Sequence, residues 1–428
     1  MPGETLNLDM KGILAVAAAT LFLLPVPARS EVPLDWEACR RMAMAQNPDF
    51  IAAKKAEEAA CANLGGRIAG LLPSASLSDS WSDGPSQKDA TRWRASLSAQ
   101  VNIFNANDWI AIMRDSASLR IAKASFRSTS AQVRQSLRGA FADMVYATEQ
   151  VRISEEIATL REHNARLVTL RYDSGRELLG GKLRVDAQLK EARANASAAK
   201  RNLMTSRAAL ARLLGRADTP EWPSVTGELS FDPSPAEFPA AAPVENLPSV
   251  VTARARVAQS RASLNTVRAR LLPTASASWS RSRVGPDYYP DDGPLSWSAG
   301  VGISLPLFSS GVLDLPFAWL AASRSLEQSE QNARMAELQA ATSLRSAWSS
   351  YAGATETVEV QEAYLAASEQ RNRESDIRYE SGFMSFENWE QIVTDFVNYK
   401  RSALRARRDA VAAEAAWMSA LGRGLEEQ

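Results

Sequence analysis

Four short segments of the chain alternate between apolar and polar residues. In the first, Ala75, Leu77 and Trp81 alternate with serines, and in the second, apolar residues occupy every other position from Trp93 to Ile103. Two similar segments follow in the second half of the chain. Strict alternation is typical of a β-strand with one apolar and one polar face. The pattern therefore predicts four strands, at about residues 74–83, 92–104, 274–283 and 296–307.

The two faces of these strands favour a membrane barrel over a sheet packed on an ordinary core. The polar face carries small Ser, Gly and Gln side chains, as a water-filled lumen would. Tryptophans lie toward the loop-proximal ends of the apolar face, where an aromatic girdle would meet the membrane boundary. They are Trp81, Trp93, Trp279 and Trp297. A sandwich or hairpin packed on a core is the alternative.

Four strands are too few to close a membrane barrel. The smallest membrane barrels have about 8 strands, and an open sheet edge is not tolerated in lipid. If the sheet spans a membrane, strands from several copies of the chain must be pooled. A dimer would then supply eight strands and a trimer twelve.

Each strand pair is followed by a long stretch of helix-forming residues. The stretches run from about residue 107 to 172 and from about 313 to 379, with no proline beyond Pro316. At about 1.5 Å per residue each makes a rod of roughly 100 Å. An Arg-Tyr-x-Ser-Gly motif ends each rod, and Gly175 and Gly382 suit the left-handed position that closes a helix. Rods without a broad apolar stripe pack side by side in an assembly, and a soluble coiled-coil hairpin is the alternative.

A further helix is expected before each strand pair. In the first half it spans Asp35 to about Gly70, and Pro73 stops it. Cys39 and Cys61 would lie about 33 Å apart along its axis. A disulfide needs Cα atoms closer than about 7 Å, so these cysteines cannot pair unless the helix is broken.

These elements recur as two copies of one unit. Residues 71–76, Leu-Leu-Pro-Ser-Ala-Ser, match residues 271–276, and residues 171–175 match residues 378–382. Landmarks that recur in the same order indicate an internal duplication. A Pro-rich linker separates the copies. The predicted divisions are a first repeat at 31–215, the linker at 216–246, a second repeat at 247–422 and a tail at 423–428.

The N-terminus has the pattern of an export signal. Lys11 precedes an apolar stretch from Gly12 to Leu24, and Ala28-Arg29-Ser30 resembles a cleavage site. We therefore expect residues 1–30 to be a signal peptide, with translation starting at Met1 or Met10. An uncleaved anchor is the alternative, but the apolar run is shorter than the ~20 residues of a spanning helix.

Composition limits the chemistry of the chain. It has 428 residues, 49 Lys and Arg against 49 Asp and Glu, 2 Cys and 1 His. Balanced charge argues against a nucleic-acid binder, which needs a basic excess. One histidine and two cysteines exclude a multi-His or all-cysteine metal centre. No nucleophile, catalytic dyad or phosphate loop is recognisable, so we expect neither an enzyme nor a cofactor.

The motifs together resemble the TolC-like outer-membrane factors, also called outer-membrane efflux proteins. The resemblance covers essentially the whole mature chain. It rests on Asn47-Pro48, the Leu-Leu-Pro before each strand pair, the strand exits Ile103-Phe104 and Pro306-Leu307-Phe308, the Arg-Tyr-x-x-Gly tips and the closing Leu-Gly. Each motif is weak alone, but the duplicated series is specific.

The resemblance implies an architecture and a set of partners. It implies a homotrimer with a 12-stranded barrel in the outer membrane of a Gram-negative cell and a long α-helical tunnel in the periplasm. The duct would passively conduct cargo from an inner-membrane RND or ABC pump through a periplasmic adaptor (membrane fusion) protein. Efflux and type I secretion use similar ducts, so drug, metal, protein and polysaccharide cargo all stay open.

The resemblance also places a periplasmic gate. In many members, aspartates six and nine residues after the second tip glycine form constriction rings. Those positions here are Asn388 and Gln391, both neutral amides. Glu387 and Glu390 lie one residue earlier and share a helix face, because they are three residues apart. A small rotation of the helix would turn these two glutamates toward the lumen instead, so they are the alternative gate residues. Carboxylate rings attract cations and amides do not, so we expect a gate that is less cation-selective than an acidic ring.

The hairpin tips are the expected adaptor-docking sites. The residues concerned are Arg171, Tyr172, Gly175, Arg378, Tyr379 and Gly382. A competing hypothesis is a periplasmic or surface coiled-coil scaffold without a pore, but it leaves the four amphipathic strands without a purpose. A secreted enzyme would be a third class, and it lacks any candidate site.

Overall fold

The structure, a computed structural model, describes most of the chain after the predicted signal peptide. The described residues are 34–82, 92–216, 225–233, 238, 244–285, 288, 290, 293–306 and 314–427. The predicted signal peptide at 1–30 and the two candidate start residues lie outside them. Both stay predictions.

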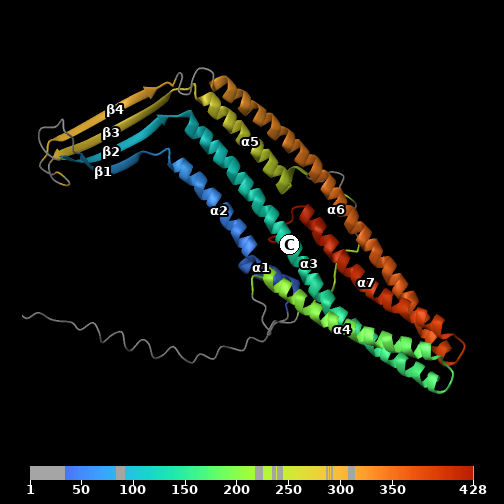
Figure 1. Ribbon diagram of the computed structural model, residues 1–428. Coiled ribbons are helices and arrows are strands. Elements are labelled where there is room, and N and C mark those ends of the chain that lie inside the picture. Colours follow the sequence, from blue (N-terminus) through green and yellow to red (C-terminus); the bar gives the residue numbers. More distant parts are fainter. Residues whose placement is uncertain are drawn as a thin grey trace, which may run out of the picture.

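The described chain is elongated, with a sheet at one end and two helical hairpins at the other (Figure 1). Two rods run the whole length between these ends, and shorter helices lie along them (Figure 1). The helices are α1 (Trp36–Gln46), α2 (Pro48–Ala69), α3 (Ala106–Asp173), α4 (Leu179–Leu213), η1 (Val244–Asn246), α5 (Pro248–Ala269), α6 (Asp314–Glu380) and α7 (Phe386–Ala420). The strands are β1 (Ser74–Ser82), β2 (Arg92–Phe104), β3 (Thr274–Gly285) and β4 (Leu295–Ser304).

The two halves of the chain have the same order of elements and nearly the same lengths. The rods α3 and α6 have 68 and 67 residues, α4 and α7 have 35 each, and α2 and α5 have 22 each. The predicted rods therefore agree with the structure, and each is followed by a shorter return helix, α4 or α7. Strand β4 ends at Ser304, whereas the sequence pattern extended it to residue 307.

The sheet is antiparallel throughout, in the order β1-β2-β3-β4. Its central pair, β2 with β3, joins the first half of the chain to the second. Residues paired across an antiparallel ladder point to the same face. Apolar residues meet in this way, as Leu77 does with Leu97 and Val101 with Ala277. The predicted alternation is therefore a real division between two faces.

The polar face is a ladder of serine hydroxyls. Ser76 and Ser98 are 2.8 Å apart, and Ser280 and Ser298 are 2.9 Å apart, in each case between Oγ atoms. On the opposite face, no element of the described chain covers the apolar side chains. Val301 is 71% exposed and Ile303 is 77% exposed. A sandwich core is thereby excluded for the sheet of the single chain.

The register corrects the predicted girdle of tryptophans. All four lie on the apolar face, and Trp81 pairs with Trp93 at the loop end of the sheet. Trp279 pairs with Ala99, six residues further along β2, which is about 20 Å at ~3.3 Å per residue. The prediction that Trp279 lies near the loop is wrong, because β3 continues beyond it to Gly285. Trp297 is third in β4, opposite Arg281.

The first predicted helix is also corrected, because it consists of two helices. The break is at Asn47, whose side-chain oxygen accepts the Phe50 N–H at 2.9 Å, while Pro48 opens α2. Proline suits the first position of a helix and Asn is a favoured cap. Despite the break, Cys39 and Cys61 are both free. Cys39 is buried, which raises its pKa to about 12, with Asp35 adding to the effect.

The half-length helices meet end to end beside each rod. We call these contacts the first seam, between α4 and α2, and the second seam, between α7 and α5. In the first seam, the Asn47 side chain donates to the Leu213 carbonyl at 2.7 Å. Glycines with positive φ, Gly215 and Gly422, close the two helices that arrive there. A Cβ on Gly215 would lie 2.1 Å from the Gln46 carbonyl oxygen, so this seam needs glycine for space as well.

The linker and the C-terminal tail are fastened across the rods near the seams. Arg138 of α3 donates to the Ser230 carbonyl at 2.7 Å, and Tyr351 of α6 donates to the Asp232 carbonyl at 2.7 Å. In the tail, Leu425 is fully buried and its N–H donates to Ser130 Oγ at 2.8 Å. As predicted, the linker has little regular structure in its described part, apart from η1 and a bridge between Leu34 and Val225.

We predict that Asn47→Ala destabilises the folded chain by about 2 kcal/mol, because it removes a cap and leaves the Leu213 carbonyl buried without its donor. The measurement is the thermal unfolding midpoint by circular dichroism in detergent. Asn47→Ser is the matched control, since serine can cap α2 but is too short to reach Leu213. Ser is expected to recover part of the loss. Equal midpoints for wild type and Asn47→Ala would refute a stabilising role.

Candidate functional site at the hairpin end of the rods

The two hairpin turns are built in the same way. Gly175 and Gly382 have φ of +72° and +82°. Their N–H groups donate to the Tyr172 and Tyr379 carbonyls at 2.9 and 3.0 Å. In each turn the N–H of the next residue donates to the carbonyl five residues before it. This is the Schellman closure of a helix. A Cβ on either glycine would meet no atom within 4 Å, so the backbone conformation alone requires glycine there.

Tyr379 does not lie at an open docking surface, which corrects one of the predicted tip residues. Its side chain is 1% exposed and stacks on Trp389 with ring centroids 4.3 Å apart. Phe386 and Val393 of α7 and Val168 of α3 belong to the same buried cluster. The ring therefore packs the two hairpins against each other.

Polar groups of the first hairpin hold Tyr379 from the other side. The Arg171 guanidinium lies 4.4 Å from its ring centroid and donates to its backbone carbonyl at 2.5 Å. The Tyr379 hydroxyl donates to Glu177 at 3.1 Å. Burial, followed by the nearby Glu177 carboxylate, raises the pKa of Tyr379 well above its ordinary value. The phenol is therefore a neutral donor that fixes the hairpins.

The equivalent residues of the two repeats have different surroundings. Tyr172 is half-buried and lies against Lys182 of its own hairpin, with Nζ 4.9 Å from the ring centroid. Arg378 is exposed, whereas its counterpart Arg171 binds Tyr379. Of the predicted tip residues, Arg378 and the two glycines are therefore open to a partner.

Two highly exposed tip residues are apolar, and the sequence analysis did not single them out. Phe383 is 87% exposed and Leu178 is 77% exposed. Each lies in the short loop between a rod and its return helix. The available signal was an apolar residue placed directly after the turn glycine, as in Gly382-Phe383. Leu179, next to Leu178, is 53% exposed, so the tips carry several uncovered apolar side chains.

The gate candidates lie on the first two turns of α7. Ser385 caps this helix and accepts the Asn388 N–H at 3.4 Å. The side chains of Glu387, Asn388 and Gln391 are exposed. The two amides and Glu387 are therefore all available to a lumen or to a neighbouring copy.

A carboxylate lies one turn beyond the amides. Gln391 donates through its amide nitrogen to Asp395 at 2.8 Å. Arg371 of α6 lies 3.9 Å from the other Asp395 oxygen. Opposite charges at this distance largely cancel each other's field, so Asp395 adds little net charge beside Gln391.

Glu390 is not a lumen residue, which corrects one of the four gate candidates. It is 4% exposed, and its carboxylate accepts bonds from Arg184 at 2.9 Å and from Gln188 at 2.5 Å. Thr394 donates to it at 2.8 Å. Both Arg184 and Gln188 belong to α4, so Glu390 ties the two return helices together. A rotation that exposed it would leave this polar group without its partners.

Arg161 of α3 extends this network to the rod. Its guanidinium donates to Gln188 at 3.1 Å and to Thr394 at 3.0 Å. Burial lowers the pKa of Arg161, while Glu390 opposes that shift. The sequence could not reveal this network, because its members come from three helices that the repeat pattern treats separately.

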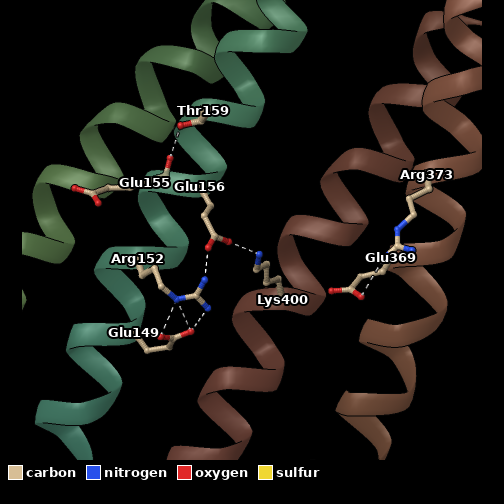
Figure 2. Close-up of polar contacts among 8 residues, drawn as sticks. All are labelled: Glu149, Arg152, Glu155, Glu156, Thr159, Glu369, Arg373 and Lys400. Atoms are coloured by element: carbon tan, nitrogen blue, oxygen red, sulfur yellow. Dashed lines mark hydrogen bonds and ion pairs between the residues drawn. The ribbon is translucent and has the colours of Figure 1, made fainter. Parts of the chain in front are cut away.

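Further up the rods, exposed ion pairs join α3 to α7. Figure 2 shows Arg152 between Glu149 and Glu156 on α3, with Lys400 of α7 reaching Glu156. The Lys400 nitrogen lies 2.5 Å from the Glu156 carboxylate. Exposed pairs of this kind contribute only about 0–1 kcal/mol each. Buried contacts therefore dominate the attachment of α7 to α3, both near the tips and at this level, where Ile153 and Ile157 share a cluster with Val397 and Leu404.

The described residues contain no cluster of three or more His, Cys, Asp or Glu that could hold a metal ion. Within the same residues, no helix is both long and apolar enough to cross a membrane. The arrangement fits a contact surface and a constriction.

Solved structures share this architecture. VceC, an outer membrane protein of Vibrio cholerae, has a TM-score of 0.76 at 18% identity, over 91% of this chain and 96% of that chain. The Campylobacter jejuni outer membrane channel CmeC has a TM-score of 0.77 at 15% identity, over 92% and 87%. The Neisseria gonorrhoeae outer membrane channel MtrE, solved in an open state, has a TM-score of 0.75 at 16% identity, over 91% and 89%.

At these identities the likeness shows the fold: mostly helical, with four strands per chain. No curated protein matches the chain. The family is shown by a sequence model described as outer membrane efflux protein, which matches residues 40–216 and 244–423. Because this match covers most of both repeats, the chain belongs to the outer membrane efflux protein family.

Proposed function

We propose that three copies of the chain form a passive duct through the outer membrane of a Gram-negative cell. Their pooled strands would make a twelve-stranded barrel, and their rods a tunnel that reaches across the periplasm. The duct would receive cargo from an inner-membrane RND or ABC pump through a periplasmic adaptor. Family membership supports the efflux role, and the assembly and its partners are our proposal.

The observation that carries this proposal is the uncovered apolar face of the sheet. Side chains such as Leu77, Trp297 and Val301 are more than half exposed in the single chain. An apolar patch of this size on a soluble protein would drive association. Lipid hydrocarbon is the solvent that suits it, and the serine ladder on the other face suits a water-filled lumen.

The free edges of the sheet explain the need for several copies. Strands β1 and β4 each have one unpaired edge in the described chain. Unpaired backbone groups cost several kcal/mol each in hydrocarbon, so β4 of one copy must pair with β1 of the next. Both a dimer and a trimer satisfy this rule, and the resemblance to outer-membrane factors favours the trimer.

The hairpin tips are the proposed adaptor-docking surface. Phe383 and Leu178 offer apolar contacts there, and Arg378 adds a charge. The buried Tyr379 would hold the two hairpins in register beneath this surface. A pore-free scaffold would also display such tips, but it would leave the apolar sheet face in water.

We predict that Val301→Lys strongly lowers the amount of trimer in outer-membrane fractions. A Lys or Arg on the lipid face of a barrel costs about 2–4 kcal/mol near the midplane, and each trimer would carry three. The measurement is heat-modifiable migration on gels of outer-membrane fractions, in which an assembled trimer dissociates on boiling.

The matched control is Gly300→Lys, one residue earlier on the polar face. A Cβ there meets no atom within 4 Å, and the lysine would point into the lumen. It is expected to assemble like wild type. Equal assembly of the two variants would contradict the proposed faces. Recovery of wild type as a soluble periplasmic protein would favour the scaffold instead.

We predict that the gate is lined by Asn388 and Gln391 and is only weakly cation-selective. Asn388→Asp should raise the cation-to-anion permeability ratio of the reconstituted trimer, because a carboxylate ring attracts cations. The substitution suits the helix, since an acidic residue near a helix N-terminus is favourable. The measurement is the reversal potential in a planar bilayer under a salt gradient.

Glu387→Gln is the control for the competing acidic face. It should change selectivity little if the amides line the gate. Strong cation selectivity in wild type that Glu387→Gln abolishes would disprove the amide gate. Glu390 is unsuitable for this test because its substitution would also break the contact with Arg184.

A further inference from the structure

The polar face of the sheet carries an arginine near its loop end. Arg94 is the third residue of β2 and pairs with Ser80 on one side and Val284 on the other. Two residues further along β2, Ser96 bonds with Ser78 in the serine ladder at 2.8 Å. Arg94 therefore lies on the same face as the ladder, and it is exposed.

That face has no carboxylate in the four described strands. Their one acidic residue, Asp79, pairs with Ala95 and lies on the apolar face. Arg281 and Arg283 pair with Leu97 and Ala95, so they are on the apolar face as well. The polar wall of the sheet is consequently positive, with Arg94 uncompensated by any acid on the strands that form it.

We propose that Arg94 forms a ring of positive charge inside the outer mouth of the duct, which makes the exit favour anionic over cationic solutes. This inference rests on the proposed function, because only closure of pooled sheets turns the polar face into a lumen. The compounds that pass most readily would then be neutral ones and anionic ones, the latter with carboxylate or phosphate groups. Charged rings of arginine or lysine are a known means of anion selection in pores.

Among the described residues, the nearest acid along the same wall lies at the opposite end of the strand. Asn102, on the polar face of β2, donates to Asp108 at the start of α3 at 3.2 Å. Eight residues separate Arg94 from Asn102, which is about 26 Å at ~3.3 Å per residue. The Debye length is about 10 Å at 0.1 M salt. Asp108 therefore leaves the positive potential at the mouth intact.

The size of the effect depends on salt. One unit charge about 10 Å from an ion in water changes the local ion concentration about twofold. Screening confines this effect near the wall at physiological salt, whereas the Debye length grows to about 30 Å at 0.01 M. The ring should thus act across a wide mouth mainly at low ionic strength.

The test is the reversal potential of the reconstituted trimer under a tenfold KCl gradient whose dilute side, at about 10 mM, faces the loop end of the barrel. Arg94→Ser should lower the anion-to-cation permeability ratio about twofold or more, and Arg94→Glu should lower it further. Arg94→Lys should keep the wild-type ratio. The serine variant extends the existing ladder, and heat-modifiable migration confirms that each variant assembles.

Arg281→Ser is the matched control, because it removes the same charge from the other face of the same sheet. It should leave selectivity unchanged. The ring would be overturned if Arg94→Ser left the selectivity unchanged, or if Arg281→Ser changed it by the same amount. In either case a conducting trimer would still support the proposed duct. Failure of wild type to form any conducting channel would instead overturn the proposed function itself.

Discussion

The structure depends on a sheet that cannot be satisfied within one chain. Its apolar face is uncovered, and its outer strands β1 and β4 each leave one edge unpaired in the described residues. Water is a poor solvent for the face, and lipid is a poor solvent for the edges. Closure with other copies in a membrane resolves both problems at once. The rods then have to stand side by side, which accounts for helices that bury little apolar surface within a single chain.

Rods of this length need support along their whole span, and the seams supply it. At each seam a return helix ends on a positive-φ glycine against the start of another helix, so two short helices act as one partner for a rod. The buried clusters around Phe141 and Trp417 lie near these points, and a third lies at the hairpin end around Trp389. Smaller buried clusters continue between these levels, around Ile157 with Leu404 and around Val358 with Ala410. Apolar packing therefore runs along the rods, and ion pairs such as that of Lys400 and Glu156 lie beside it.

Sequence periodicity predicted what depends on local pattern. The alternation of residues 93–103 determined both the strand and its faces, and glycines 175 and 382 fixed the ends of the rods. Predictions were wrong where a contact between distant segments decides the outcome. The break at Asn47 is a partial exception, because Pro48 is a local signal that disfavours helix at the residue before it, and only the contact with Leu213 is long-range. Tyr379 is buried because the other hairpin packs on it. Such contacts leave no periodic signal, since each partner alone is compatible with a simple helix.

The gate and the exit can be considered together as filters in series. At the hairpin end, Glu390 is occupied by Arg184, and Asp395 lies beside Arg371, so amides are the open polar groups on α7 together with Glu387. At the other end, Arg94 is an exposed charged group on the serine face. A cation would find little attraction at the first filter and repulsion at the second, whereas an anion would meet no acidic strand residue on the way out. The zero net charge of the chain therefore conceals an uneven distribution of charge along the described part of the proposed path.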